Sequence, residues 1–105
     1  AHNECMSIRH TVVFRLAHDT GSTEGATFLA DGRRILSAIP GVEGFTVSRQ
    51  VSAKSDAAFQ FAMDFADQAV YDAYDQHPDH VGFVRDRWIP EVAAFQEYDF
   101  VDLPG

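Results

Sequence analysis

The chain has 105 residues, 46% of them hydrophobic and 12% aromatic, a composition that predicts one folded domain and excludes a disordered chain. Sixteen acidic residues against eight basic ones give a net charge of −8, so nucleic acid is not an expected partner. No apolar run approaches the length of a membrane span, and no membrane partner is expected. The single cysteine, Cys5, cannot form an internal disulfide, which favours a reducing, cytoplasmic location.

The domain is expected over residues 6–102, and the polar residues 1–5 are treated as an irregular N-terminal extension. Its first predicted element is a strand. Alternation of period two places five residues on one strand face: Ile8, His10, Val12, Phe14 and Leu16.

A helix is expected after the polar turn at 19–21, with Ser22 as its N-cap. Its apolar stripe consists of Phe28, Leu29, Ile35, Leu36 and Ile39, and Pro40-Gly41 ends it. Gly32 lies in the same stripe, where a bulky residue would be expected and where glycine costs roughly 1 kcal/mol of helix propensity relative to alanine. We therefore expect a notch in the helix face beside the first strand.

Two further strands are expected over about 43–51 and 59–65. In the second of them, Phe59, Phe61, Met63 and Phe65 share one face, and this alternation is the strongest strand pattern in the chain.

A second helical region should begin after Asp67, which is a suitable cap. Its first helix carries Val70, Tyr71 and Tyr74 and is interrupted at His77-Pro78, because a residue before proline avoids the helical conformation. Pro78 suits the first turn of a new helical segment, in which His80, Val84 and Trp88 lie on one face. A strand over about 94–101 completes the order.

The element order β-α-β-β-α-β predicts an α+β, ferredoxin-like fold with a four-stranded antiparallel sheet and both helices on one face. The uncovered face would carry alternate residues of the first and third strands: Thr11, Val13, Arg15, Gln60, Ala62 and Asp64. Because this mixture is not a fully solvated surface, we expect a second copy of the chain to cover it and form a homodimer.

Three segments resemble the stress-responsive dimeric α/β-barrel domain family, abbreviated Dabb. They are Arg9-His10-Thr11-Val12-Val13-Phe14, Ile39-Pro40-Gly41-Val42 and, most specifically, Tyr74-Asp75-Gln76-His77-Pro78-Asp79-His80-Val81-Gly82-Phe83. The resemblance covers about 6–102. It implies a homodimer whose two sheets close into a barrel, with a small cavity between sheet and helices in each subunit.

Most members of this family have no established activity. One plant branch is similar to the chain over the same motif and acts as a polyketide cyclase, closing a linear poly-β-keto thioester by aldol chemistry without metal or organic cofactor. The resemblance places the tyrosine and general-base histidine of that branch on Tyr74 and His80, and its strand-one histidine on His10. Where that branch has an aromatic pocket residue on the first helix, this chain has Gly32.

These residue types support proton transfer, because an imidazole acts as base and acid near neutral pH and a phenol donates a hydrogen bond to a carbonyl oxygen. The candidate catalytic residues are therefore His80, Tyr74 and His10. The candidate pocket-lining residues are Val12, Phe14, Phe28, Gly32, Phe59, Phe61 and Trp88.

Each candidate also has a structural interpretation. His80 can cap or pack at a helix start, His10 can be a hydrogen-bonded core residue, and the aromatic residues belong first to the core. His77 is expected to belong to the turn before Pro78. His77 and His80 have a spacing that suits a metal, but no third ligand is indicated, so neither a metal site nor a cofactor is expected.

Three classes of function remain open at this point. The first is a cofactor-independent cyclase or lyase acting on a small hydrophobic carbonyl compound. The second is a non-catalytic module that binds such a molecule in the same cavity. The third is a purely structural dimer whose aromatic side chains fill the cavity. A cavity lined by His80 and Tyr74 would favour the first two.

Overall fold

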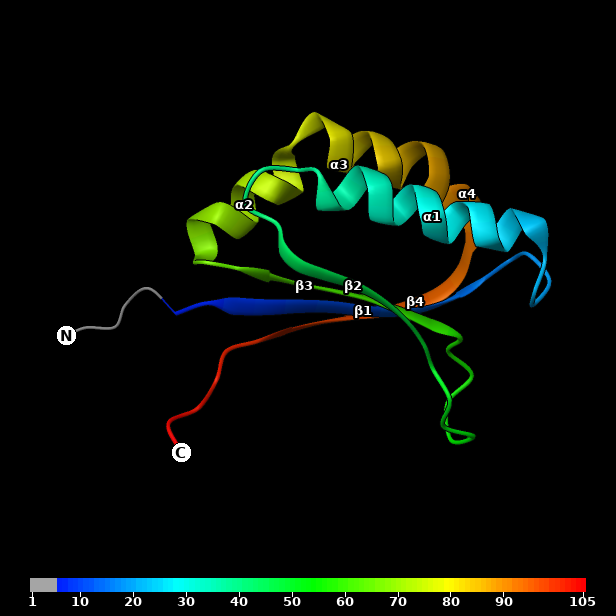
Figure 1. Ribbon diagram of the computed structural model, residues 1–105, viewed down its shortest axis with the longest axis horizontal. Helices are drawn as coiled ribbons and strands as arrows, with labels where there is room; N and C mark the ends of the chain where they lie inside the picture. Colours follow the sequence, from blue (N-terminus) through cyan, green and yellow to red (C-terminus); the bar gives the residue numbers. More distant parts are fainter. Residues whose placement is uncertain (1–5) are drawn as a thin grey trace.

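The computed structural model describes residues 6–105, which form one sheet with all of the helices on one of its faces (Figure 1). The elements are β1 (Ile8–Leu16), α1 (Thr23–Ser37), β2 (Glu43–Arg49), β3 (Phe59–Phe65), α2 (Gln68–Gln76), α3 (Pro78–Phe83), the π-helical turn η1 (Val84–Trp88), α4 (Ile89–Glu91) and β4 (Val92–Phe100). The extension expected at residues 1–5 lies outside the described residues.

The sheet has the strand order β2-β3-β1-β4, and every neighbouring pair is antiparallel, which confirms the predicted ferredoxin-like arrangement. Predicted strand boundaries shift by up to two residues. β2 ends at Arg49 rather than at 51, and β4 begins at Val92 rather than at 94. The earlier start of β4 follows a register shift between Arg15 and Leu16, beyond which Leu16 pairs with Val92.

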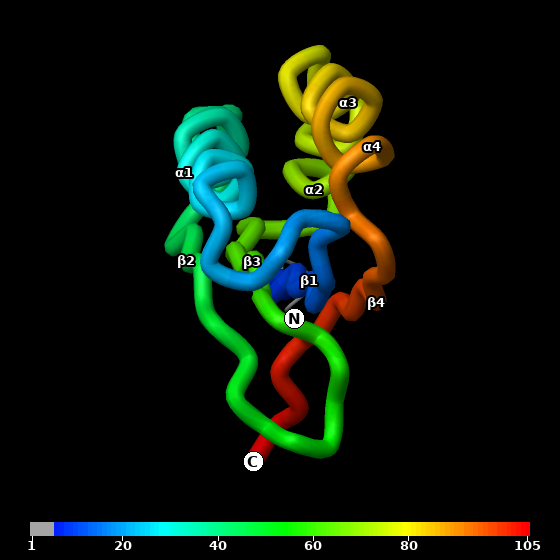
Figure 2. Tube along the Cα trace, turned by 90° about the vertical axis from the view of Figure 1, so that its right-hand side faces the viewer, coloured from blue at the N-terminus to red at the C-terminus, as the bar shows by residue number. Residues whose placement is uncertain are grey.

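The helices form a second layer above the sheet. Viewed from the side, α1 lies over the β2 edge and the α2 to α4 segment lies over the β4 edge (Figure 2). The connection between β2 and β3 extends past the sheet, away from the helices (Figure 1). Within residues 6–105, no helix has the length and apolar character needed to cross a membrane.

The predicted helix starts are confirmed by their hydrogen bonds. The Oγ of Ser22 accepts from the Gly25 N–H at 3.1 Å, and the Oδ1 of Asp67 accepts from the Val70 N–H at 2.9 Å. The break before Pro78 is confirmed as well. His77 takes an extended conformation there, and its Nδ1 accepts from the Asp79 N–H at 3.1 Å, so His77 caps α3 as a turn residue.

The core lies between the helices and the apolar face of β1 and β3. The register pairs Val12 with Phe61 and Phe14 with Phe59, so the two alternating apolar rows predicted from the sequence share the helix-covered face. The buried apolar residues are Ile8, Val12, Phe14, Leu16, Phe28, Leu36, Ile39, Phe61, Met63, Phe65, Tyr71, Tyr74 and Phe83.

The expected notch at Gly32 is wrong. A Cβ atom at this position would lie 2.6 Å from Cζ of Phe61 and 3.4 Å from Cζ of Phe83, so aromatic rings already occupy the space. Gly32 therefore permits close packing of α1 against β3, which is a structural reason for glycine in the middle of a helix.

Candidate functional site

A cavity of about 450 Å³ lies between the helix-covered face of the sheet and the segment from α2 to α4. Its polar lining residues are His10, Tyr74, Asp75, His80 and Glu97, and the other lining side chains are apolar. Its volume falls within the range of small-molecule sites. The aromatic side chains do not fill the interior completely, which favours the two binding interpretations over a purely structural dimer.

The structure brings the three catalytic candidates to this one cavity. The ring centroids of Tyr74 and His80 are 4.5 Å apart, and those of His10 and Tyr74 are 6.5 Å apart. The sequence left the placement of Tyr74 relative to His80 open, because the proline break interrupts the helix between them. That break turns α3 so that His80 lies over the last turn of α2.

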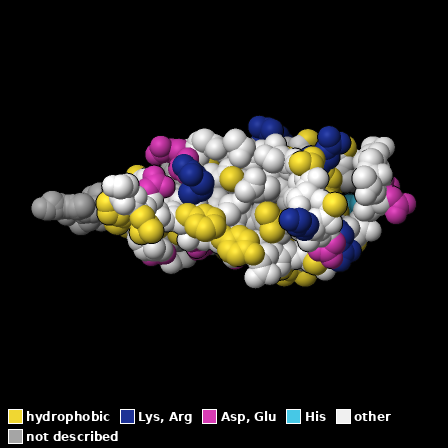
Figure 3. Space-filling view, turned by 90° about the horizontal axis from the view of Figure 1, so that it is seen from below, with side chains coloured by type: hydrophobic (Ala, Val, Ile, Leu, Met, Phe, Trp, Pro, Cys, Tyr) yellow, Lys and Arg dark blue, Asp and Glu magenta, His cyan; other side chains and the backbone are white. Residues whose placement is uncertain are grey.

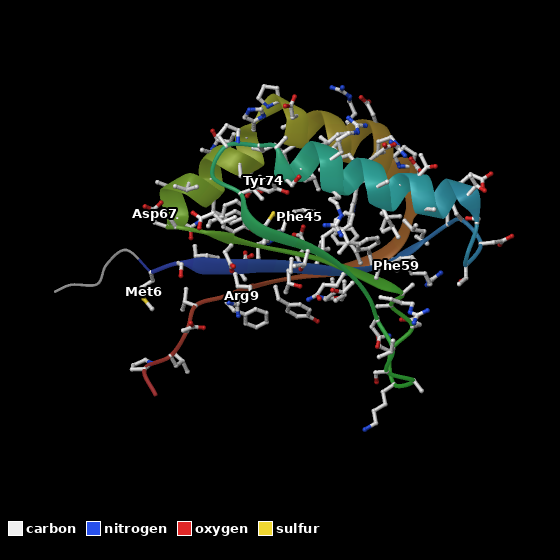
Figure 4. The ribbon with its side chains drawn as sticks, viewed as in Figure 1. Met6, Arg9, Phe45, Phe59, Asp67 and Tyr74 are labelled. Atoms are coloured by element: carbon white, nitrogen blue, oxygen red, sulfur yellow. The ribbon has the colours of Figure 1, made fainter. Side chains whose placement is uncertain are left out.

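The predicted pocket-lining residues divide into two groups. Val12, Phe61 and Trp88 line the cavity, whereas Phe14, Phe28, Gly32 and Phe59 do not. The second group lies in the packed core or farther along the sheet. Figure 4 shows Tyr74 in the layer between helix and sheet, with Phe59 toward the opposite end of the sheet.

His80 is held in one tautomer by the backbone. Its Nδ1 lies 3.0 Å from the carbonyl oxygen of Asp75. A carbonyl oxygen only accepts hydrogen bonds, so the proton of the neutral ring is on Nδ1 and Nε2 is the basic nitrogen. Since His80 lines the cavity, this arrangement suits a general base.

Tyr74 supplies a hydroxyl group to the same cavity. Its residue is only 2% exposed, and within residues 6–105 its hydroxyl has no hydrogen-bond partner. Burial, reinforced by the charges of Asp75 and Glu97, raises the pKa of the Tyr74 phenol well above its ordinary value. The phenol therefore stays protonated and is available as a donor, and leaving it unpaired costs about 1–3 kcal/mol.

His10 belongs to a hydrogen-bonded group that the sequence analysis missed. Its Nδ1 lies 2.6 Å from Oδ1 of Asp99 and 2.8 Å from the hydroxyl of Tyr71, and that hydroxyl donates to the Asp99 carboxylate at 3.0 Å. Burial and the hydrogen bond to Asp99 raise the pKa of Tyr71, so Tyr71 is a donor here. The carboxylate thus accepts from both rings and orients the imidazole of His10.

Two carboxylates at the cavity were also missed, Asp75 at the end of α2 and Glu97 on β4. Burial raises the pKa of Asp75 above its ordinary value, against the opposing charges of His80 and His10. Alternation along β4 would have placed residues 95, 97 and 99 on one face, but only the β1–β4 register identifies that face as the inner one. Within the described residues, no three His, Cys, Asp or Glu side chains form a group that could hold a metal ion.

A second cavity of about 560 Å³ lies at the other end of the sheet, between the start of α1 and the β2–β3 connection. Its histidine, His18, forms a hydrogen bond with Glu91, with 2.7 Å between Nε2 of His18 and Oε1 of Glu91. None of the three catalytic candidates lines it. Despite its larger volume, this cavity lacks the acid–base groups found in the first one.

The fold and the cavity define a ferredoxin-like α+β domain with a cavity of about 450 Å³ under its helices. The chain belongs to the Dabb family, the stress responsive A/B barrel domain, whose family model matches residues 8–102. The comparison with curated proteins gave no match.

Several solved structures share this fold. A Dabb family protein with a ferredoxin-like fold from Mesorhizobium loti is 56% identical, with a TM-score of 0.93 over 94% of this chain and 99% of that one. A dimeric ferredoxin-like protein of unknown function from Thermobifida fusca is 22% identical, with a TM-score of 0.76 over 96% and 95% of the chains. Hydroxynitrile lyase from Passiflora edulis is 12% identical, with a TM-score of 0.82 over 96% and 97%. At these last two identities, the likeness is one of fold.

Proposed function

We propose that the chain is a cofactor-independent cyclase or lyase that acts on a small carbonyl compound by acid–base chemistry. The observation that carries this proposal is the hydroxyl of Tyr74, which is buried, protonated and, among residues 6–105, without a hydrogen-bond partner beside the ring of His80. A carbonyl oxygen in the cavity would accept the hydrogen bond that this hydroxyl lacks.

The proposed mechanism follows from the donor and acceptor roles of the two side chains. Nε2 of His80 takes a proton from the carbon next to the carbonyl group, or from a hydroxyl group whose loss of a proton breaks a carbon–carbon bond. In the first route, negative charge develops on the carbonyl oxygen of the enolate, and the Tyr74 hydroxyl stabilises it. The imidazolium of His80 then gives its proton to the alkoxide that forms when the enolate carbon attacks a second carbonyl group. In the second route, the electron pair of the O–H bond forms the new carbonyl group, whose oxygen accepts from Tyr74. The electron pair of the broken carbon–carbon bond leaves with the other fragment, which takes the proton from the imidazolium of His80. His10, oriented by Asp99, offers a second basic nitrogen to the same cavity.

Two comparisons support an enzyme of this kind. The chain resembles a plant cyclase branch over the segment that contains Tyr74 and His80, and a protein of the same fold is a hydroxynitrile lyase. The second candidate function is non-catalytic binding of a hydrophobic small molecule. The apolar lining of the cavity, which includes Leu36, Met63 and Trp88, favours it equally.

An exchange experiment separates the two candidates. We expect the wild-type chain to accelerate incorporation of deuterium from D₂O into the methyl group of acetophenone, followed by proton NMR. Replacing His80→Gln should abolish this acceleration, and Tyr74→Phe should reduce it by about 10²–10³-fold, the usual cost of losing one oxyanion donor. Tyr98→Phe, on the opposite sheet face, is the control and should keep the wild-type rate.

Binding is measured in parallel by the fluorescence of Trp88, which is the single tryptophan and lines the cavity. Binding of acetophenone without any exchange would support the non-catalytic candidate. Absence of both binding and exchange across a panel of small ketones and aldehydes would contradict both candidates.

We also propose that the uncovered sheet face pairs with a second copy of the chain. Viewed from below, this face carries apolar side chains, aromatic rings among them, interrupted by charged groups (Figure 3). The outward-facing residues of β4 include Tyr98 and Phe100, which are about half exposed. Solved structures of the same fold from Thermobifida fusca and Bacteroides fragilis are dimeric, which supports the same assembly here.

A further inference from the structure

The cavity described above carries an excess of negative charge. Two carboxylate side chains, Asp75 and Glu97, line it, and no lysine or arginine does. Within residues 6–105, neither carboxylate forms an ion pair. A third carboxylate, Asp99, lies directly behind His10. The basic side chains in the lining are the imidazoles of His10 and His80.

The surroundings do not neutralise these carboxylates. Burial raises the pKa of Asp75 by more than the opposing charges of His80 and His10 lower it. Asp75 and Glu97 likewise raise the pKa of Tyr74 by disfavouring its anion. With the two imidazoles in their neutral form, the lining therefore carries a net negative charge, which would repel a bound anion.

Aromatic rings form much of the remaining wall. Phe61, Phe83 and Trp88 line the cavity, and the faces of such rings attract cations through their quadrupole. The buried hydroxyl of Tyr74, 2% exposed and unpaired within the described residues, is an independent indication that a ligand occupies this space.

We infer that the cavity selects an organic cation: an apolar carbonyl compound that carries a protonated amine, in preference to a carboxylate of the same size. The amine lies against the carboxylates of Asp75 and Glu97, while the carbonyl group meets Tyr74. The carbonyl part of this statement rests on the proposed function, whereas the charge preference concerns binding alone. The two are therefore tested separately.

Isothermal titration calorimetry with three matched probes tests the charge preference: 4-(aminomethyl)acetophenone, 4-(hydroxymethyl)acetophenone and 4-acetylbenzoate at pH 7.5. We expect the amine to bind most tightly and the carboxylate most weakly, with a ratio of about tenfold or more between them. Asp75→Asn and Glu97→Gln should each reduce this ratio, and the double variant should bring it close to one.

Asp72→Asn is the matched control, because Asp72 is an exposed carboxylate of the same helix that does not line the cavity. It should leave the ratio near the wild-type value. Should Asp75→Asn fail to fold, the affinity ratio is measured with Glu97→Gln on the edge strand β4 instead. If the hydroxymethyl probe binds and the carboxylate probe binds as tightly as the amine, the charge preference is wrong and the proposed function stands. If none of the three probes binds, both are wrong.

Discussion

Nδ1 of His10 lies 2.6 Å from a carboxylate oxygen of Asp99, although 89 positions separate the two residues in the chain. The β1–β4 register creates this contact by placing them directly opposite each other. The carboxylate accepts the Nδ1 proton and leaves Nε2 of His10 as the basic nitrogen of the neutral ring. Because the His10 side chain is 7% exposed and lines the cavity, its tautomer affects any chemistry performed there.

The tautomer of His10 can be measured. We expect long-range ¹H–¹⁵N NMR spectra of the wild-type chain at pH 8 to show the Nδ1–H form of its neutral imidazole. Asp99→Ala removes the acceptor and should produce a mixture of tautomers, while Asp102→Ala, just beyond β4, should not. The fold should survive, because the Asp99 side chain is 45% exposed. An Nε2–H tautomer in the wild-type chain would contradict the assignment.

Asp75 is expected to lower the stability of the folded chain. Burial raises its pKa in the folded state above the ordinary value of 3.8. At pH 7 the carboxyl group is ionised in both states, so the folded state bears the unfavourable charge. As the pH falls through the folded pKa, the carboxyl group takes up a proton there first and the destabilisation is lost.

Asp75→Asn should therefore raise the melting temperature at pH 7, by about 1–4 °C given the partial exposure of the side chain. The difference from wild type should shrink toward pH 3, and calorimetry over this range checks it. Asp72→Asn, which loses an exposed hydrogen bond from Gln68, should not reproduce this pH dependence. A lower melting temperature for Asp75→Asn at pH 7 would show that the carboxylate is stabilised in the fold.

Gly32→Ala should destabilise the chain although alanine is the better helix former. The new Cβ would lie 2.6 Å from the buried ring of Phe61, and overpacking of this kind costs about 1–3 kcal/mol. This exceeds the gain in helix propensity of up to about 1 kcal/mol. Urea unfolding should show a net loss of up to about 2 kcal/mol.

Gly82→Ala is the control for this substitution. A Cβ at Gly82, in α3, would meet only the end of the Arg85 side chain, at 3.8 Å. This change should stabilise the chain by up to about 1 kcal/mol. Equal stabilisation by both substitutions would mean that α1 can move away from Phe61.

Local patterns were enough to predict most of the fold. Alternation in β1 and β3, the caps Ser22 and Asp67, and the break at Pro78 all depend on residues close together in the sequence. The start of β4 was misplaced because it depends on a register shift in pairing with β1. The space around Gly32 was misjudged for a similar reason, since a ring from β3 fills it.

The candidate site divides in the same way. Tyr74, His80 and His10 were identified because the segments that contain them resemble the Dabb family. In the structure, all three line one cavity. Asp99 and Glu97 were missed because their position on the inner face is set by pairing between β1 and β4, the first and last strands of the chain. A period-two pattern alone cannot say which face of an edge strand is the inner one.

Association through the uncovered sheet face can be tested at Tyr98. This residue lies on the outward face of β4, with its ring centroid 6.0 Å from that of Phe100. Sedimentation equilibrium at micromolar concentration should give the wild-type chain a mass of twice 11.7 kDa. Interfaces between copies that are stable at such concentrations bury on the order of 1,200–2,000 Å², which requires most of this face.

Tyr98→Asp should weaken association about 30-fold or more, because an aromatic residue near the middle of an interface is commonly worth at least about 2 kcal/mol and a buried, unpaired carboxylate adds to the loss. Val81→Asp is the matched control, since Val81 is 47% exposed and Tyr98 is 46% exposed, but Val81 belongs to α3 in the helix layer on the other face. Arg15→Glu, at a charged position of the uncovered face, should also weaken association more than folding. A wild-type chain that sediments with the mass of one copy would show that no dimer forms at this concentration. Equal effects of Tyr98→Asp and Val81→Asp would show that the copies do not associate through the uncovered sheet face.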